Sequence, residues 1–173
     1  KRFFECDMDS KGEIIDHSKC FNGLKIMSAG EKYKEHMGKY PVIFLTLSGA
    51  KALTYKDCIR SLRNDIVNEL VHHAYLLQSE NISEKEKEQF SYYYWEKTES
   101  DEEYTDALLF LSSLLYKHHG LKPFILVDEY DVPLQNAMLN GFGKEMTSYI
   151  RRLFENVFKK NPYLGKGIIT GCL

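Results

Sequence analysis

The sequence of 173 residues lacks the features that mark several common classes of protein. No apolar run approaches the roughly 18 residues of a membrane span, and the first residues do not resemble a secretory signal. The formal net charge is −2, so the chain has no basic excess to attract phosphate backbones. We therefore expect a cytoplasmic protein with no membrane segment and no direct binding of nucleic acid.

Metal-binding cysteine patterns are missing as well. The four cysteines lie far apart, at Cys6, Cys20, Cys58 and Cys172. Without a Cys-x-x-Cys spacing, they are typical of reduced thiols. The adjacent histidines His72-His73 and His118-His119 would point about 100° apart on a helix, so neither pair converges on one ion. We interpret them as residues of helix surfaces and helix ends.

The sequence also contains no phosphate-binding loop. Such a loop reads Gly-x-x-x-x-Gly-Lys-Ser/Thr, and its backbone amides and lysine hold nucleotide phosphates. None of the 11 glycines is followed by Lys-Ser or Lys-Thr, and Gly143-Lys144 is not preceded by a predicted strand. Residues 1–173 therefore lack the loop amides and lysine that a P-loop uses to hold phosphates.

The most informative feature that is present is the run from Phe124 to Asp131. Pro123 starts an extended segment, and four consecutive apolar residues then predict a central strand that is covered on both faces. Asp128 and Glu129 follow at its carboxyl end, where ligands bind in parallel sheets. An aspartate suits magnesium, and the next acid can orient an attacking water, as in a Walker B segment.

The rest of the pattern alternates strands with helices. Strands are predicted over 42–47 and 167–171, the second of them buried, and short helices and loops over 1–39. Longer helices are predicted from Thr54 to about Leu77, after Ser83, over 104–119 and over 146–158, and a short helix is predicted over 132–139. This order implies right-handed crossovers and a parallel sheet, with Thr46 and Ser48 on the same side as the acids.

Three segments resemble one family. They are Ile125-Leu126-Val127-Asp128-Glu129-Tyr130-Asp131-Val132-Pro133-Leu134, Asn161-Pro162-Tyr163-Leu164 and Thr170-Gly171-Cys172-Leu173. Together with Tyr40-Pro41-Val42-Ile43, they are similar to the AAA-ATPase-like domain of bacterial proteins, which is often followed by a PD-(D/E)XK nuclease-like domain. The resemblance extends from about Phe21 to Leu173.

The resemblance implies an α/β, P-loop NTPase-like three-layer fold and the use of ATP and Mg²⁺. By its motif, Asp128 would serve the metal and cofactor, Glu129 would activate water, and Thr170 would be a polar sensor near the γ-phosphate. In the family the phosphate loop would lie upstream of Lys1, so we expect residues 1–173 to be a partial domain that lacks the phosphate-loop strand and helix. Self-association through the sheet edge left at Ile168-Ile169 is then expected.

Two other functions remain open. Asp128, Glu129 and Asp131 could form a metal-dependent phosphohydrolase or nuclease site, although Glu129-Tyr130-Asp131 lacks the lysine of a Glu-x-Lys motif. Alternatively, an ATPase-like scaffold could serve as a non-catalytic interaction or regulatory module. The aromatic run Tyr92-Tyr93-Tyr94-Trp95 is interpreted as packing on the core, and a partner contact is the alternative.

Overall fold

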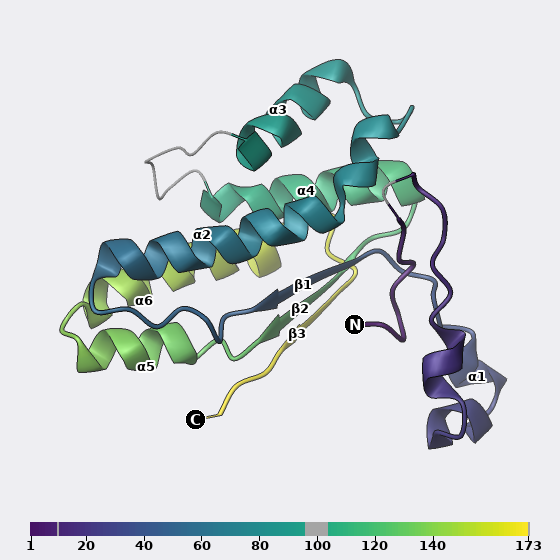
Figure 1. The fold of residues 1–173 in the computed structure, drawn as a ribbon, viewed down its shortest axis with the longest axis horizontal. Coiled ribbons are helices and arrows are strands. Elements are labelled where there is room, and N and C mark those ends of the chain that lie inside the picture. The colour runs from purple at the N-terminus through teal and green to yellow at the C-terminus, as the bar shows by residue number, and fades with distance from the viewer. Residues whose placement is uncertain (10, 96–103, 173) are drawn as a thin grey trace.

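A parallel sheet lies at the centre of the protein, in a computed structural model that describes residues 1–9, 11–95 and 104–172. In this part of the chain the strands are β1 (Val42–Thr46), β2 (Phe124–Asp128) and β3 (Lys166–Ile169). They are parallel and ordered β1-β2-β3 (Figure 1). The predicted α/β class with a parallel sheet is confirmed, and β2 is the central strand.

The described part of the chain contains five helices of eight or more residues. They are α2 (Tyr55–His72), α3 (Glu84–Trp95), α4 (Tyr104–His119), α5 (Val132–Leu139) and α6 (Gly143–Phe154), which continues into the π-helical turn η4 (Glu155–Lys159). Figure 1 shows α2, α4 and α6 on one side of the sheet. The shorter elements are η1 (Ser18–Phe21), η2 (Lys25–Ser28), α1 (Glu31–Lys34) and η3 (Ala74–Gln78).

Local capping explains where these helices begin and end. Thr54 Oγ1 accepts a hydrogen bond from the Asp57 amide, and the Ser83 amide donates to the Glu86 carboxylate, so both predicted starts are capped. At the other end of α4, Gly120 adopts a φ of 67°, a left-handed conformation that glycine reaches without strain. The start of α2, the start of α3 and the end of α4 therefore lie where the sequence predicts them.

The core lies between the sheet and the layer of α2, α4 and α6. Alternate strand residues point into it, namely Ile43, Leu45, Ile125 and Val127, all at most 2% exposed. Each such side chain stabilises the fold by about 1.5–3 kcal/mol relative to an exposed one. The other face of β2 carries Phe124 and Leu126, which are only half-buried. The prediction that both faces of β2 are fully covered is therefore wrong for the described residues.

The exposure of β3 and of His73 also differs from what the sequence suggests. The third strand was expected to be buried over 167–171, but β3 covers Lys166–Ile169 and all four residues are exposed. Among the described elements β3 packs mainly against β2, whereas β1 is also covered by α2. His73 lies at the end of α2, as expected for a helix-end histidine, but it is buried and only 2% exposed. It hydrogen-bonds Glu69 and Tyr75, which compensates for its removal from water.

The helix from Thr54 is also shorter than predicted. It ends at His72, and residues 74–78 form the separate 3₁₀ helix η3, so Ala74 and Leu77 do not extend α2. In the aromatic run, Tyr93 is buried and contacts Tyr104 and Phe110, as expected for packing on the core. The side chain of Trp95 and residues 96–103 lie outside the described part of the chain.

The segment before β1 consists of loops and short helices, as predicted. Residues 3–6 run parallel to residues 38–40, with hydrogen bonds from the Cys6 amide to the Tyr40 carbonyl and from the Tyr40 amide to the Phe4 carbonyl, both 2.8 Å long. Tyr40 stacks on Phe124 at the start of β2. Among the described residues, no helix has the length and apolar character needed to cross a membrane.

Candidate functional site

The candidate site lies where the three strands reach their carboxyl ends. Asp128 is the last residue of β2 and stands opposite Thr46, the last residue of β1. Thr170 follows the end of β3, and its amide donates to the Val127 carbonyl. The parallel register therefore places a threonine on each side of Asp128, at the edge where ligands bind in parallel sheets. The prediction that Thr46 lies beside the acids is confirmed by this register.

Hydrogen bonds fix the Asp128 carboxylate from two directions. The Thr170 hydroxyl donates to Oδ1 over 2.5 Å, and the Glu129 amide donates to the same oxygen over 3.0 Å. Within the described residues both bonds go to Oδ1, which leaves Oδ2 for another ligand. The backbone is held as well, since the Leu47 amide donates to the Asp128 carbonyl. Asp128 is thus oriented before any ligand binds.

Glu129 has an unusual backbone conformation. Its φ is 53°, and it is the only residue other than glycine with a positive φ in the described chain. A left-handed conformation costs a residue with a side chain on the order of 1–3 kcal/mol, and such strained residues cluster at active sites and ligand-binding sites. Its half-buried carboxylate has no hydrogen-bond or ion-pair partner among the described residues. The turn therefore presents this carboxylate at the strand end without committing it to a structural contact.

Asp131 differs from the two preceding acids, because it is 4% exposed and lies at the start of α5. Its Oδ2 accepts a hydrogen bond of 2.8 Å from Gln135 Nε2. A side chain on Gly171 would come within 2.5 Å of Asp131 Oδ1 and 2.9 Å of the Tyr130 ring. Gly171 thus allows the chain after Thr170 to pass close to this buried acid.

The three acids do not form a joint metal site. In the described part of the chain, the group of Glu5, Asp7 and His72 is the one whose three ligand atoms lie within 4.8 Å of one another. Asp128, Glu129 and Asp131 are not such a group, so the geometry gives no support to the phosphohydrolase or nuclease alternative that used all three.

One site feature was not assigned from the sequence. The close approach at Gly171 depends on the position of Asp131 in three dimensions, and the only sequence signal is a glycine directly after Thr170.

At the end of β1, the hydroxyl of Thr46 also donates to Ser48 Oγ over 3.1 Å, so Ser48 adds a second hydroxyl to this strand end. The side chains at the carboxyl end of the sheet are therefore polar, whereas those in the middle of β1 and β2 are apolar.

Comparison with known proteins bears on this arrangement. The family model described as "Predicted AAA-ATPase" matches residues 3–173, nearly the whole chain. The protein belongs to this AAA-ATPase-like family. No curated protein and no solved structure matched the chain. Membership in the AAA-ATPase-like family confirms the resemblance found in the sequence and supports a general ATPase-like domain.

Proposed function

We propose that this chain supplies the Walker B part of an ATP-binding and ATP-hydrolysing domain. The observation that carries the proposal is the pair Asp128-Glu129 at the carboxyl end of the central strand, in a chain of the AAA-ATPase-like family. Asp128 is held by the Thr170 hydroxyl and the Glu129 amide, whereas the Glu129 carboxylate has no structural partner among the described residues. This difference matches a division of labour between holding a metal and orienting a water.

The donor chemistry of the site fits Mg²⁺. This ion prefers oxygen ligands and is commonly shared between one or two carboxylates and substrate phosphates. Asp128 Oδ2 would hold it, with Thr46 and Thr170 as neighbouring hydroxyls. When bound, the ion would neutralise charge that develops on the phosphate oxygens.

The protein's own residues would then orient the reacting groups. Glu129 would accept a hydrogen bond from the attacking water and orient it, and Thr170 would keep Asp128 in place. The resemblance implies that the phosphate loop, and a possible nuclease-like domain, belong to other parts of the polypeptide. A cytoplasmic location remains a prediction from composition.

A hydrolysis assay on the protein expressed from its complete reading frame tests the proposal. We expect Glu129→Gln to lower ATP turnover at least 100-fold, because an amide cannot act as a base toward water. Glu145→Gln, an exposed acid of α6, is the matched control and should keep the wild-type rate. Equal activity of Glu129→Gln and the control would contradict the assignment of Glu129.

An alternative is the non-catalytic module built on an ATPase-like scaffold. The strained conformation of Glu129 argues for the catalytic assignment, because a scaffold gains nothing from a left-handed glutamate at a strand end. Absence of ATP hydrolysis by the complete protein, with a wild-type fold, would favour the scaffold.

A further inference from the structure

A second group of polar side chains lies at the opposite end of the sheet from Asp128. Glu5 pairs with Tyr40, just before β1 begins, whereas Asp128 lies where the strands end. One oxygen of Glu5, one oxygen of Asp7 and one nitrogen of His72 all lie within 4.8 Å of one another. We call these three residues the amino-end cluster.

The backbone brings the two acids of the amino-end cluster together. Hydrogen bonds with Tyr40 hold residues 4–6 beside residue 40, and the Ile15 amide donates to the Asp7 carbonyl. Residues two apart in an extended segment point to the same side, so Glu5 and Asp7 face one way. There they meet His72, the last residue of α2, whose Nε2 lies 3.0 Å from Glu5 Oε1 and 3.5 Å from Asp7 Oδ1.

The cluster concentrates negative charge away from water. The side chains of Glu5 and Asp7 are 2% and 12% exposed, and buried Asp7 Oδ1 has no hydrogen-bond partner among the described residues. Lys1 Nζ lies 3.5 Å from Glu5 Oε1, and the imidazoles of His72 and His17 lie beside the two acids and are cationic when protonated. A buried carboxylate oxygen without a hydrogen bond is costly, and a cation beside it offsets that cost.

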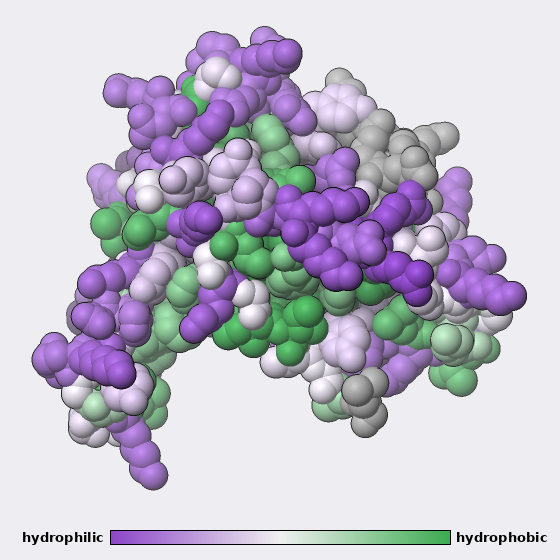
Figure 2. Space-filling model, turned by 180° about the vertical axis from the view of Figure 1, so that it is seen from behind, coloured by the Kyte–Doolittle hydropathy of each residue, from purple (hydrophilic) through white to green (hydrophobic). Residues whose placement is uncertain are grey.

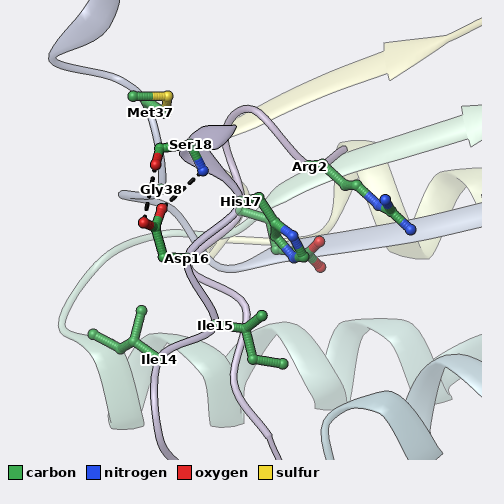
Figure 3. A pocket seen from close by; sticks show the side chains of 9 residues that line it. Arg2, Ile14, Ile15, Asp16, His17, Ser18, Met37 and Gly38 are labelled. Carbon is green, nitrogen blue, oxygen red and sulfur yellow. Dashed lines mark hydrogen bonds between the residues drawn. The ribbon is translucent and has the colours of Figure 1, made fainter. Parts of the chain in front are cut away.

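His17 supports the cluster from outside. Its Nε2 lies 2.7 Å from Asp7 Oδ2, the oxygen that faces away from His72. His17 and Glu5 both line a pocket of about 260 Å³, where His17 lies between Arg2 and Asp16 (Figure 3). Of the amino-end cluster, Glu5 lines this pocket. A histidine that hydrogen-bonds a ligating carboxylate is a common outer partner in metal sites.

We propose that Glu5, Asp7 and His72 bind a divalent transition-metal ion, with Zn²⁺ as the ion of best fit and His17 as a positioning residue. Two carboxylates and one imidazole give a mixed oxygen and nitrogen donor set, which suits Zn²⁺, whereas Mg²⁺ and Ca²⁺ prefer oxygen alone. Bonds of about 2.0–2.2 Å require the three side chains to close in on the ion by rotation. A fourth position would remain for water.

Such a site would tie the start of the chain to the end of α2. Glu5 and His72 are 67 residues apart in sequence. The segment that carries Glu5 is otherwise held by backbone bonds to residues 38–40 and by contacts of Phe4 with Phe124 and of Lys1 with Phe44. Ion binding to the folded chain alone would raise its thermal stability in proportion to the logarithm of ion concentration.

Zn²⁺ titration of the 173-residue chain by calorimetry tests this proposal. We expect one ion per chain with a micromolar or tighter Kd, and a loss of affinity of at least tenfold in both His72→Gln and Asp7→Asn. His36→Gln, a half-buried histidine outside the cluster, is the matched control and should bind like wild type. Circular dichroism of each variant shows whether it remains folded.

Co²⁺ spectroscopy of the wild-type chain provides a test that needs no variant. Visible bands of four-coordinate Co²⁺ are expected, and His17→Gln should keep these bands while weakening Co²⁺ affinity about tenfold. Absence of the bands, or Zn²⁺ affinity in folded His72→Gln equal to that of the control, would overturn the proposal.

Discussion

At the scale of single residues, the carboxylates of this protein fall into different environments. Asp128 has two hydrogen-bond donors on one oxygen, Glu129 has none among the described residues, and Asp131 is buried against Gly171. The sequence predicts that the first two follow a central strand. It does not predict the left-handed turn at Glu129. It also does not predict the burial of Asp131, against which the chain after β3 packs at Gly171.

Asp65 on α2 is a further acid whose environment has a measurable consequence. Its Oδ2 is buried without a hydrogen-bond partner in the described chain, and burial raises the pKa of Asp65 from 3.8 to about 6. Because the pKa of Asp65 is higher in the folded state than in the unfolded state, its contribution to the free energy of unfolding is fully present below about pH 4, where the carboxyl is protonated in both states. This contribution is lost as the pH rises through about 6, because the buried side chain must then carry a charge.

We therefore predict that Asp65→Asn is stabilising at pH 8 but not at pH 4. The expected gain in the free energy of unfolding at pH 8 is about 1 kcal/mol, well below the full electrostatic cost because the side chain is partly exposed. Urea unfolding at both pH values measures it, with exposed Glu88→Gln as a control that should change little. A variant that is destabilised equally at both pH values would show that burial does not raise this pKa.

At the scale of secondary-structure elements, the two edges of the sheet are protected differently. On the β1 edge, the Phe44 amide donates to Glu69 Oε1 over 2.8 Å, so a side chain of α2 occupies a group that could pair with another strand. On the β3 edge, Ile168 and Ile169 are 42% and 43% exposed. Figure 2 shows hydrophobic side chains gathered along the lower side of the molecule. An exposed apolar edge strand readily pairs with other chains.

We predict that the 173-residue chain self-associates through β3. Light scattering at several concentrations should show an apparent mass that rises with concentration, and Ile168→Lys should reduce this rise because an edge lysine disfavours strand pairing. Leu139→Lys replaces an even more exposed apolar residue, on α5, and should have no such effect. A monodisperse monomer at every concentration would contradict the prediction.

The elements also show what sequence patterns can and cannot predict. Helical spacing and caps place α2, α3 and α4, because Thr54, Ser83 and Gly120 act through neighbouring residues. Exposure of β3 is not predictable in this way, since Gly167-Ile168-Ile169 is apolar whether or not a helix covers the strand. The Glu69 contact with Phe44 joins residues 25 positions apart and has no local signal.

At the scale of the whole molecule, the two ends of the sheet carry different chemical groups. The carboxyl end carries Asp128 with Thr46 and Thr170, and the amino end carries the amino-end cluster. The sequence predicts the first end because its residues adjoin strands. It does not predict the second, because Glu5 and Asp7 meet His72 only through the packing of the first residues beside Tyr40.

The missing phosphate loop leads to a prediction for the chain as a unit. The 173 residues contain no Gly-Lys-Ser or Gly-Lys-Thr, so no lysine and loop amides are available in that pattern to position a γ-phosphate. We expect ATP turnover by this chain alone to lie far below the roughly 1 per second of ordinary enzymes. A phosphate-release assay measures it, and turnover near that value would show that another arrangement holds the phosphates.

The most direct test of the central claim is the Mg²⁺ dependence of ATP binding by the protein from its complete reading frame. If Asp128 holds the ion and Glu129 orients the water, Glu129→Gln should bind ATP with nearly wild-type affinity in the presence of Mg²⁺. Asp128→Ala should lose at least tenfold in affinity with Mg²⁺ and little without it. Equal affinities of the two variants under both conditions would contradict the assignment of Asp128 and Glu129 to separate roles.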